Sequence, residues 1–114
     1  MTLKNFKNKL ENDPNSIEFS ETMAVIDNNY NFSPTTFTNG TVHNVAGENS
    51  GSCKLFAFAK LQDFSKAETL ACFGTFYFND VLKDPKGKDH QNIRNFMQTG
   101  FEGLQFETEA LIPK

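Results

Sequence analysis

The side chains in this chain that could do chemistry are concentrated in two short polar segments. The first contributes His43, Asn44, Asn49, Ser50, Ser52 and Cys53, and the second contributes Asp89, His90, Asn92 and Arg94. Their imidazole, hydroxyl, amide, thiol and guanidinium groups are suited to hydrogen bonding, nucleophilic attack or anion binding. The chain has only two histidines and two cysteines, so these segments hold most of the groups from which a functional site could be built.

Cys53 is a candidate nucleophile. It lies near the start of a predicted helix, where the positive end of the helix dipole favours a thiolate, and His43 could act as its base. A cysteine in a run rich in alanine and phenylalanine is more often a small buried side chain. We therefore expect Cys53 to be buried, and Cys72, between Ala71 and Phe73, likewise. The sequence leaves enzymatic activity open but weighs against it.

No metal ion or other cofactor is predicted. A zinc site needs ligands at a spacing such as C-x-x-C or H-x-x-x-H, whereas His43, Cys53, Cys72 and His90 are each isolated in the sequence. Asp89 beside His90 could supply a carboxylate and an imidazole, but neighbouring residues on a helix point in different directions. Asp89 is better explained as the N-cap of a helix.

The run Asn49-Ser50-Gly51-Ser52 leads into a predicted helix and could present backbone N–H groups to a phosphate or carboxylate. It matches neither the phosphate-loop pattern G-x-x-x-x-G-K-[ST] nor the dinucleotide pattern G-x-G-x-x-G. An ordinary helix start capped by Ser50 or Ser52 is the simpler interpretation.

A second polar run, on the later helix, suits recognition of a carboxylate or an amide. It includes Asn92, Arg94 and Asn95. A solvated helix face is the alternative interpretation. Arg94 could instead close an internal ion pair, with Asp80 or Asp27 as its partner.

The elements that must position these side chains are predicted from periodicity, capping and turn residues. Amphipathic spacing indicates helices at 3–11, 21–29 and 90–99, the first capped by Thr2 and the last ended by Gly100. Residues 53–61 fit both strand and helical periodicity, and their alanine content favours a helix. The S-x-x-E capping box at 65–68 begins a further helix that continues to residue 81. Asn39-Gly40 predicts a hairpin turn between arms at 37–38 and 41–42, and residues 104–107 alternate as a late strand. The expected fold is α+β: four or five helices packed with a small antiparallel sheet, in a single domain, 1–114.

Composition excludes several classes of partner. The 114 residues include 11 Lys and Arg against 14 Asp and Glu, a net charge of −3, so no broad basic surface for nucleic acid is expected. No apolar stretch approaches the ~20 residues that span a bilayer, and no secretory signal is recognised. We therefore expect no membrane partner, reduced cysteines and a cytoplasmic protein.

The chain has thirteen phenylalanines and no tryptophan, so phenylalanine supplies most of the aromatic side chains of the predicted core. The consecutive residues Phe76, Tyr77 and Phe78 cannot all point to one side of a helix. We expect surrounding protein to bury them. The alternative is an exposed aromatic patch that binds a protein partner.

Several motifs together resemble a known family. They are Thr-Met-Ala-Val-Ile-Asp at 22–27, Phe-Thr-Asn-Gly at 37–40, His-Asn at 43–44, Asn-Ser-Gly-Ser-Cys-Lys at 49–54, Phe-Ala-Phe-Ala at 56–59, Ala-Cys-Phe-Gly at 71–74 and Asp-His-Gln-Asn-Ile-Arg-Asn-Phe-Met at 89–97. Nearly end to end, the chain is similar to the HopJ type III effector family. The resemblance implies a bacterial protein, and the family name implies secretion into a host cell. It brings no established catalytic residues.

The motifs of this resemblance include both polar segments. We therefore expect residues 43–53 and the helix start at 89–95 to meet in the fold and to form a site for a small polar or anionic ligand. The alternative is a secreted effector or interaction module that binds a protein partner through the aromatic patch. A Cys53/His43 enzyme is the third hypothesis.

Overall fold

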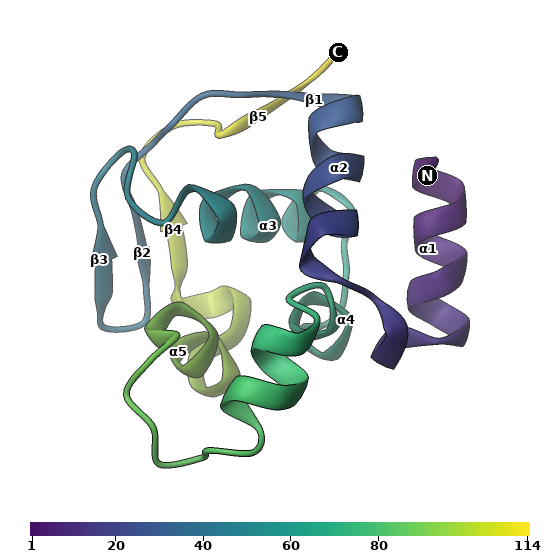
Figure 1. Cartoon of the computed structure of the whole chain (residues 1–114). Coiled ribbons are helices and arrows are strands. Elements are labelled where there is room, and N and C mark those ends of the chain that lie inside the picture. Colours follow the sequence, from purple (N-terminus) through teal and green to yellow (C-terminus); the bar gives the residue numbers. More distant parts are fainter.

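The computed structural model describes all 114 residues as an α+β fold (Figure 1). Its α-helices are α1 (Leu3–Asn12), α2 (Phe19–Asn29), α3 (Ser50–Leu61), α4 (Lys66–Ala71) and α5 (Gln91–Thr99). Its strands are β1 (Tyr30–Phe32), β2 (Phe37–Asn39), β3 (Val42–Asn44), β4 (Leu104–Phe106) and β5 (Leu111–Pro113). Two short 3-10 helices, η1 (Pro14–Ser16) and η3 (Gly100–Gly103), and a π-helix, η2 (Phe76–Val81), complete the chain. The predicted class, helices packed with small antiparallel sheets, is confirmed.

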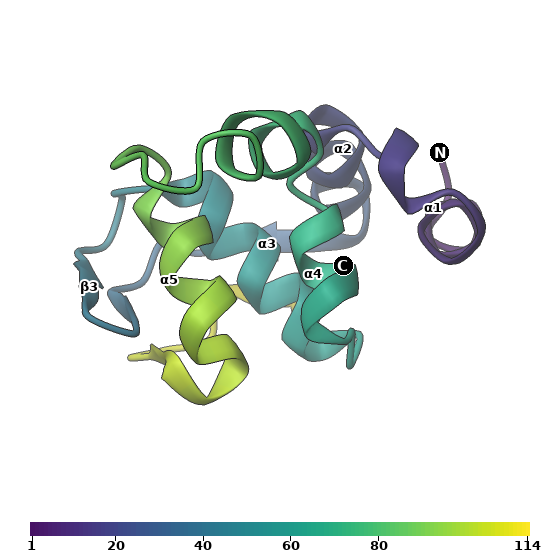
Figure 2. The same ribbon diagram turned by 90° about the horizontal axis from the view of Figure 1, so that it is seen from below.

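The helix α3 lies at the centre of the fold, with the other helices and the strands arranged around it (Figures 1 and 2). Cys53 and every residue from Leu55 to Ala59 are buried, within one cluster of 23 buried side chains. A helix buried on all sides carries no single apolar stripe, which explains why residues 53–61 fit both helical and strand periodicity. At 12 residues α3 is the longest helix, and no helix combines the length and apolar composition that crossing a membrane requires.

The first helix packs against α2 as an amphipathic element. Thr2 caps its start through a side-chain hydrogen bond, as predicted, and Phe6 and Leu10 are buried. Lys9 Nζ lies 2.9 Å from each carboxylate oxygen of Glu21 in α2, and this contact lowers the pKa of Glu21. The same carboxylate closes a capping box on the backbone N–H of residue 18, so α2 begins at residue 19 instead of 21.

The hairpin of β2 and β3 turns one residue later than predicted. Asn39 pairs with Val42, so the turn residues are Gly40 and Thr41 rather than Asn39 and Gly40. Gly40 has a φ of +61°, which suits the first position of a type II′ turn. The shift takes the Asn39 side chain away from the hairpin tip and places it in the interior, where it is fully buried.

The helix predicted from residue 65 to 81 is not continuous, and its second part is a separate π-helix. The capping box of Ser65 and Glu68 is present, but α4 ends at Ala71 and Gly74 adopts a left-handed φ of +62° before η2 begins. Gly74 packs against backbone, because a Cβ there would come within 2.8 Å of the Ile17 carbonyl oxygen. The break therefore lets the chain pass close to residues 17–19.

Both sheets join segments that are far apart in the sequence. β4 pairs antiparallel with β2, which gives the order β3-β2-β4, and β5 pairs antiparallel with β1. The late strand β4 agrees with the prediction, whereas β1 and β5 carry no recognisable pattern. Each has only three residues, which is too short for alternation to be distinctive.

Replacing Gly74 with alanine should destabilise the fold strongly. The new Cβ must displace backbone atoms of residues 17–19, and a left-handed alanine costs a further ~1 kcal/mol. We expect urea denaturation, followed by circular dichroism, to show a loss of about 2–4 kcal/mol in the free energy of unfolding. Gly47→Ala is the matched control, because Gly47 also has a positive φ, +93°, but nothing lies within 4 Å of its Cβ position. Equal losses for the two variants would contradict the close packing of Gly74.

Candidate functional site

Buried asparagine side chains connect the two polar segments. Asn92 Nδ2 donates to Asn44 Oδ1 at 3.0 Å, and Asn44 Nδ2 donates to Asn92 Oδ1 at 3.2 Å. Asn39 Nδ2 donates to the Asn92 backbone oxygen at 2.7 Å and to Asn92 Oδ1 at 3.1 Å. Asn49 Nδ2 completes this amide network by donating to Asn44 Oδ1 at 2.6 Å.

The amide network joins β2, β3, the start of α3 and the start of α5. Asn39 and Asn44 are at most 1% exposed and Asn92 is 7% exposed, so the hydrogen bonds among these three lie in the interior, where an unpaired amide is costly; Asn49 reaches them from the surface. Asn39 Oδ1 is the one buried side-chain oxygen or nitrogen that has no partner. The two polar segments thus meet in the fold, and Asn44 and Asn92 are their main points of contact.

The two helices that begin in these segments start in the same unusual way. Their N-cap residues, Asn49 for α3 and His90 for α5, both have a left-handed backbone with a φ of 49°. Neither N-cap side chain binds the first turn of its helix, so the first backbone N–H groups of both helices lack a side-chain cap. Left-handed residues other than glycine are uncommon and cluster at functional sites.

The helix caps predicted from the sequence are wrong at these two positions. Ser50 and Ser52 lie inside α3 rather than before it, and Ser50 Oγ donates to the backbone oxygen of Gly47 at 3.4 Å. Asp89 comes one residue too early, and His90 takes the N-cap position of α5. The side chain of Asp89 is instead held by an arginine. Neither helix start is therefore capped by the serine or aspartate side-chain oxygen that the sequence predicted.

Arg94 holds the loop that leads into α5. Its Nη2 donates to Asp89 Oδ1 and its Nε to the Asp89 backbone oxygen, both at 2.6 Å, and its Nη1 donates to the Asp84 backbone oxygen at 2.8 Å. The guanidinium lowers the pKa of Asp89. An internal ion pair of Arg94 is thus present, but with Asp89 in place of Asp80 or Asp27. Because all three guanidinium nitrogens donate to the loop, Arg94 shapes the loop instead of facing a ligand.

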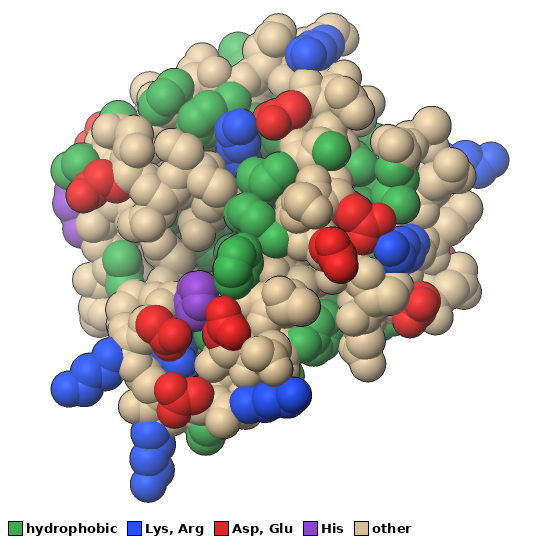
Figure 3. Space-filling view, in the orientation of Figure 1, with side chains coloured by type: hydrophobic (Ala, Val, Ile, Leu, Met, Phe, Trp, Pro, Cys, Tyr) green, Lys and Arg blue, Asp and Glu red, His purple; other side chains and the backbone are tan.

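His90 is held from one side by a carboxylate. Its Nε2 lies 3.1 Å from Asp80 Oδ2 in η2, and its ring centroid lies 5.3 Å from that of Phe76. The other ring nitrogen, Nδ1, forms no hydrogen bond within the protein. When the ring is protonated and Nε2–H donates to Asp80, Nδ1–H is free to donate to an external acceptor. Figure 3 shows the two histidines of the chain as separate purple patches, each with acidic side chains beside it.

A cavity of about 390 Å³ opens between the first turns of α3 and α5. Four residues of the predicted segments line it: Asn49, Ser52, His90 and Asn92. The rest of its lining is partly polar and partly aromatic and consists of Phe19, Val42, Gly51, Phe73, Phe76, Gln91 and Ile93. Its volume is in the range of small-molecule sites. We call it the interhelix cavity.

Cys53 and His43 do not form a pair of nucleophile and base. Both cysteines are free and buried, as predicted. Burial raises the pKa of the Cys53 thiol, although a backbone hydrogen bond with Thr35 partly opposes this, and burial raises the pKa of Cys72 to about 12. His43 is exposed on β3 and lies outside the interhelix cavity. A thiol with a raised pKa is a poor nucleophile, so the geometry argues against a Cys53/His43 enzyme.

The aromatic side chains of the cavity were missed as site residues. Contrary to the expected burial, Phe76 is 39% exposed and is the only exposed phenylalanine. Tyr77 and Phe78 are half-buried against the core. Phe19 and Phe73 reach the cavity from the start of α2 and from the break before η2. The available signal was the run of aromatics at 76–78, which exceeds what one helix face can bury.

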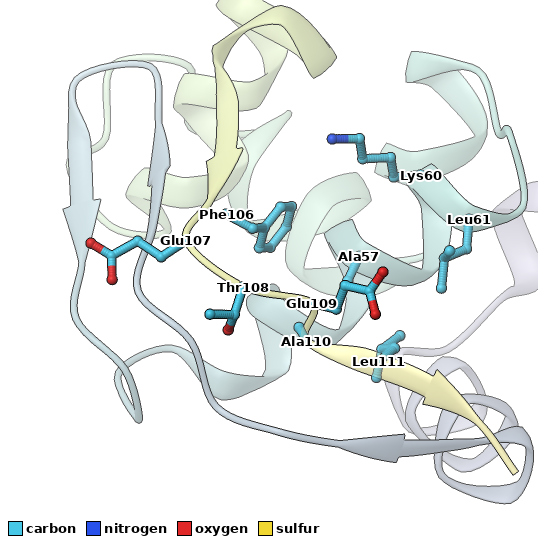
Figure 4. A pocket seen from close by; sticks show the side chains of 9 residues that line it. All are labelled: Ala57, Lys60, Leu61, Phe106, Glu107, Thr108, Glu109, Ala110 and Leu111. Carbon is cyan, nitrogen blue, oxygen red and sulfur yellow. The ribbon is translucent and has the colours of Figure 1, made fainter.

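A larger cavity of about 640 Å³ lies between the end of α3 and the segment that joins β4 to β5 (Figure 4). Lys60 Nζ lies 5.9 Å from the centre of the Phe106 ring. Glu109 points toward α3 in Figure 4, whereas Glu107 points away toward the hairpin. This cavity contains no residue of the two polar segments and no converging set of donors. Nowhere do three or more His, Cys, Asp or Glu side chains come together to hold a metal ion.

Comparison with known proteins agrees with this architecture. The family model described as HopJ type III effector protein matches residues 3–111. A crystal structure of VPA0580, a protein of unknown function, is 58% identical in sequence and superposes with a TM-score of 0.98. The match covers 100% of this chain and 95% of that chain. No curated protein matches the chain.

Removing the Asn92 amide should destabilise the fold much more than removing the half-buried amide of Asn95 from the same helix. Asn92→Ala leaves the buried donors of Asn39 and Asn44 without their side-chain acceptor, and we expect about 3 kcal/mol less unfolding free energy in urea. Asn95→Ala is the matched control, because its Oδ1 bonds Thr41 at the exposed surface, and it should cost less than about 1 kcal/mol. A similar cost for both variants would contradict the importance of the buried network.

Proposed function

The chain belongs to the HopJ type III effector protein family, and from this premise we propose that it binds a small anionic ligand through a phosphate or carboxylate group in the interhelix cavity. One observation carries the proposal. The first turns of two helices, α3 and α5, converge on one cavity, and neither turn is capped by a side chain.

The backbone at these helix starts favours negative charge. The first N–H groups of a helix have no partner within it, and the helix dipole places about half a positive charge at this end. Gly51 and Ser52 of α3 and Gln91, Asn92 and Ile93 of α5 line the same cavity. A single tetrahedral or planar anion between the two turns could therefore accept hydrogen bonds from both.

The net negative charge of the chain does not oppose this proposal, because the two carboxylates beside His90 each have a partner. Asp80 Oδ2 lies 3.1 Å from His90 Nε2, and Asp89 forms an ion pair with Arg94. The charge of Arg94 cancels most of the field of Asp89, and His90 does the same for Asp80 when its ring is protonated. His90 adds a favourable group when its ring is protonated, because Nδ1–H then has no protein partner while Nε2–H donates to Asp80.

What supports binding over catalysis is the lack of a reactive group beside His90. The thiols are buried with raised pKa values, and the only hydrogen-bond partner of the His90 ring is the carboxylate of Asp80. The remaining polar groups of the cavity are amides, one hydroxyl and backbone N–H groups. These groups hold and orient a ligand but do not provide a nucleophile with an adjacent base.

Inorganic phosphate, titrated into the protein in a calorimeter, tests the proposal. We expect saturable binding that weakens about ten-fold or more in His90→Asn, because a charge-assisted hydrogen bond is lost. Asparagine suits this position because it tolerates a left-handed backbone, as Asn49 does. His43→Asn is the matched control, since His43 is exposed outside the cavity, and it should bind phosphate as the wild type does. Absence of saturable binding of both phosphate and acetate by the wild type, or equal weakening of phosphate binding in the two variants, would contradict the proposal.

A further inference from the structure

Phe19 and Phe76 form an aromatic wall of the interhelix cavity. Their ring centroids are 5.3 Å apart, with an edge-to-face angle of 69°. Phe73 stacks on Phe19 at 6.1 Å and is itself buried in the core. The wall is thus supported from behind and presents aromatic surface to whatever occupies the cavity.

Each ring of the wall lies beside one of the two helix starts. A methyl group at Gly51 would come within 2.8 Å of Phe19 Cζ, so this ring rests on the first turn of α3. The Phe76 ring lies 5.3 Å from the ring of His90, the N-cap of α5. If the helix starts hold the anionic group of a ligand, the rest of that ligand lies next to the aromatic side chains of Phe19 and Phe76.

The exposure of Phe76 indicates that this surface is not simply part of the core. At 39% exposed it differs from the other phenylalanines, which the fold buries fully or partly. Phe19 and Phe76 also border a neighbouring cavity of about 310 Å³, together with Glu18, Ser20 and Thr75. The wall consequently has open space on two sides, and a planar group could lie against it.

We infer that the ligand is an aromatic anion, in which a planar ring carries a phosphate or carboxylate group directly or one atom away. This inference rests on the proposed anion-binding function and adds the chemistry of the rest of the ligand. The helix starts and His90 take the anionic group, and Phe19 and Phe76 take the ring. The volume of the cavity, about 390 Å³, is within the range that holds a ring-sized ligand.

Paired probes that differ only in the ring separate this inference from the proposed function. Phenyl phosphate is compared with methyl phosphate, and benzoate with acetate, by titration calorimetry on the full chain. We expect the aromatic member of at least one pair to bind about ten-fold more tightly than its aliphatic partner, because an aromatic contact contributes favourable binding free energy of this size. The pair that shows the preference identifies the anionic group.

Phe76→Leu removes the ring while keeping an apolar side chain at the surface. We expect it to reduce the aromatic preference to three-fold or less while the Kd for methyl phosphate changes by less than two-fold. Phe78→Leu is the matched control, because Phe78 is on the same π-helix but does not line the cavity, and it should keep the preference. Thermal melting of both variants confirms that they fold.

Equal affinity for the aromatic and aliphatic probes would overturn the inference and leave the proposed function standing, since methyl phosphate would still bind. Failure of every probe to bind would overturn both. Loss of the preference in Phe78→Leu to the same extent as in Phe76→Leu would overturn the assignment of the ring to the Phe19 and Phe76 wall.

Discussion

The geometry of the site depends on the reciprocal hydrogen bonds between the buried amides of Asn44 and Asn92. These side chains are almost completely shielded from water that could replace a lost partner, so the hairpin and α5 must pack in a single register to keep them paired. Asn39 and Asn49 extend the constraint to β2 and to the start of α3. Helix starts that are distant in the sequence are thereby held at one cavity.

The central position of α3 adds a second constraint. Because its middle is buried on every side, only its two ends reach the surface, and each end opens into a cavity. The first turn presents unpaired N–H groups between Phe19 and α5, whereas the last turn presents Lys60 and Leu61 to the β4–β5 segment. The dipole of one helix therefore gives the two cavities different electrostatic character, and the N-terminal cavity is the one suited to an anion.

Local signals in the sequence predicted most of the elements, but not the break at Gly74 or the N-caps of α3 and α5. Periodicity and the Thr2 cap correctly indicated α1, and the α+β class followed from the number of such elements. The end of α4 was missed because the break at Gly74 is set by contact with residues 17–19, which no local pattern reveals. The hairpin register was shifted because Asn39 serves the interior network instead of the turn. In the same way, clustering of polar residues identified the two segments, whereas the aromatic wall depends on tertiary packing.

The central claim is that one anion is held by both helix starts at the same time. The most direct measurement is an NMR titration of nitrogen-15-labelled protein with inorganic phosphate, following the backbone amides of residues 50–52 and 91–93. The account predicts that both sets of resonances shift and that they follow one saturation curve, because they report the same bound anion. Shifts confined to one helix start, or two sets that saturate at different phosphate concentrations, would contradict it.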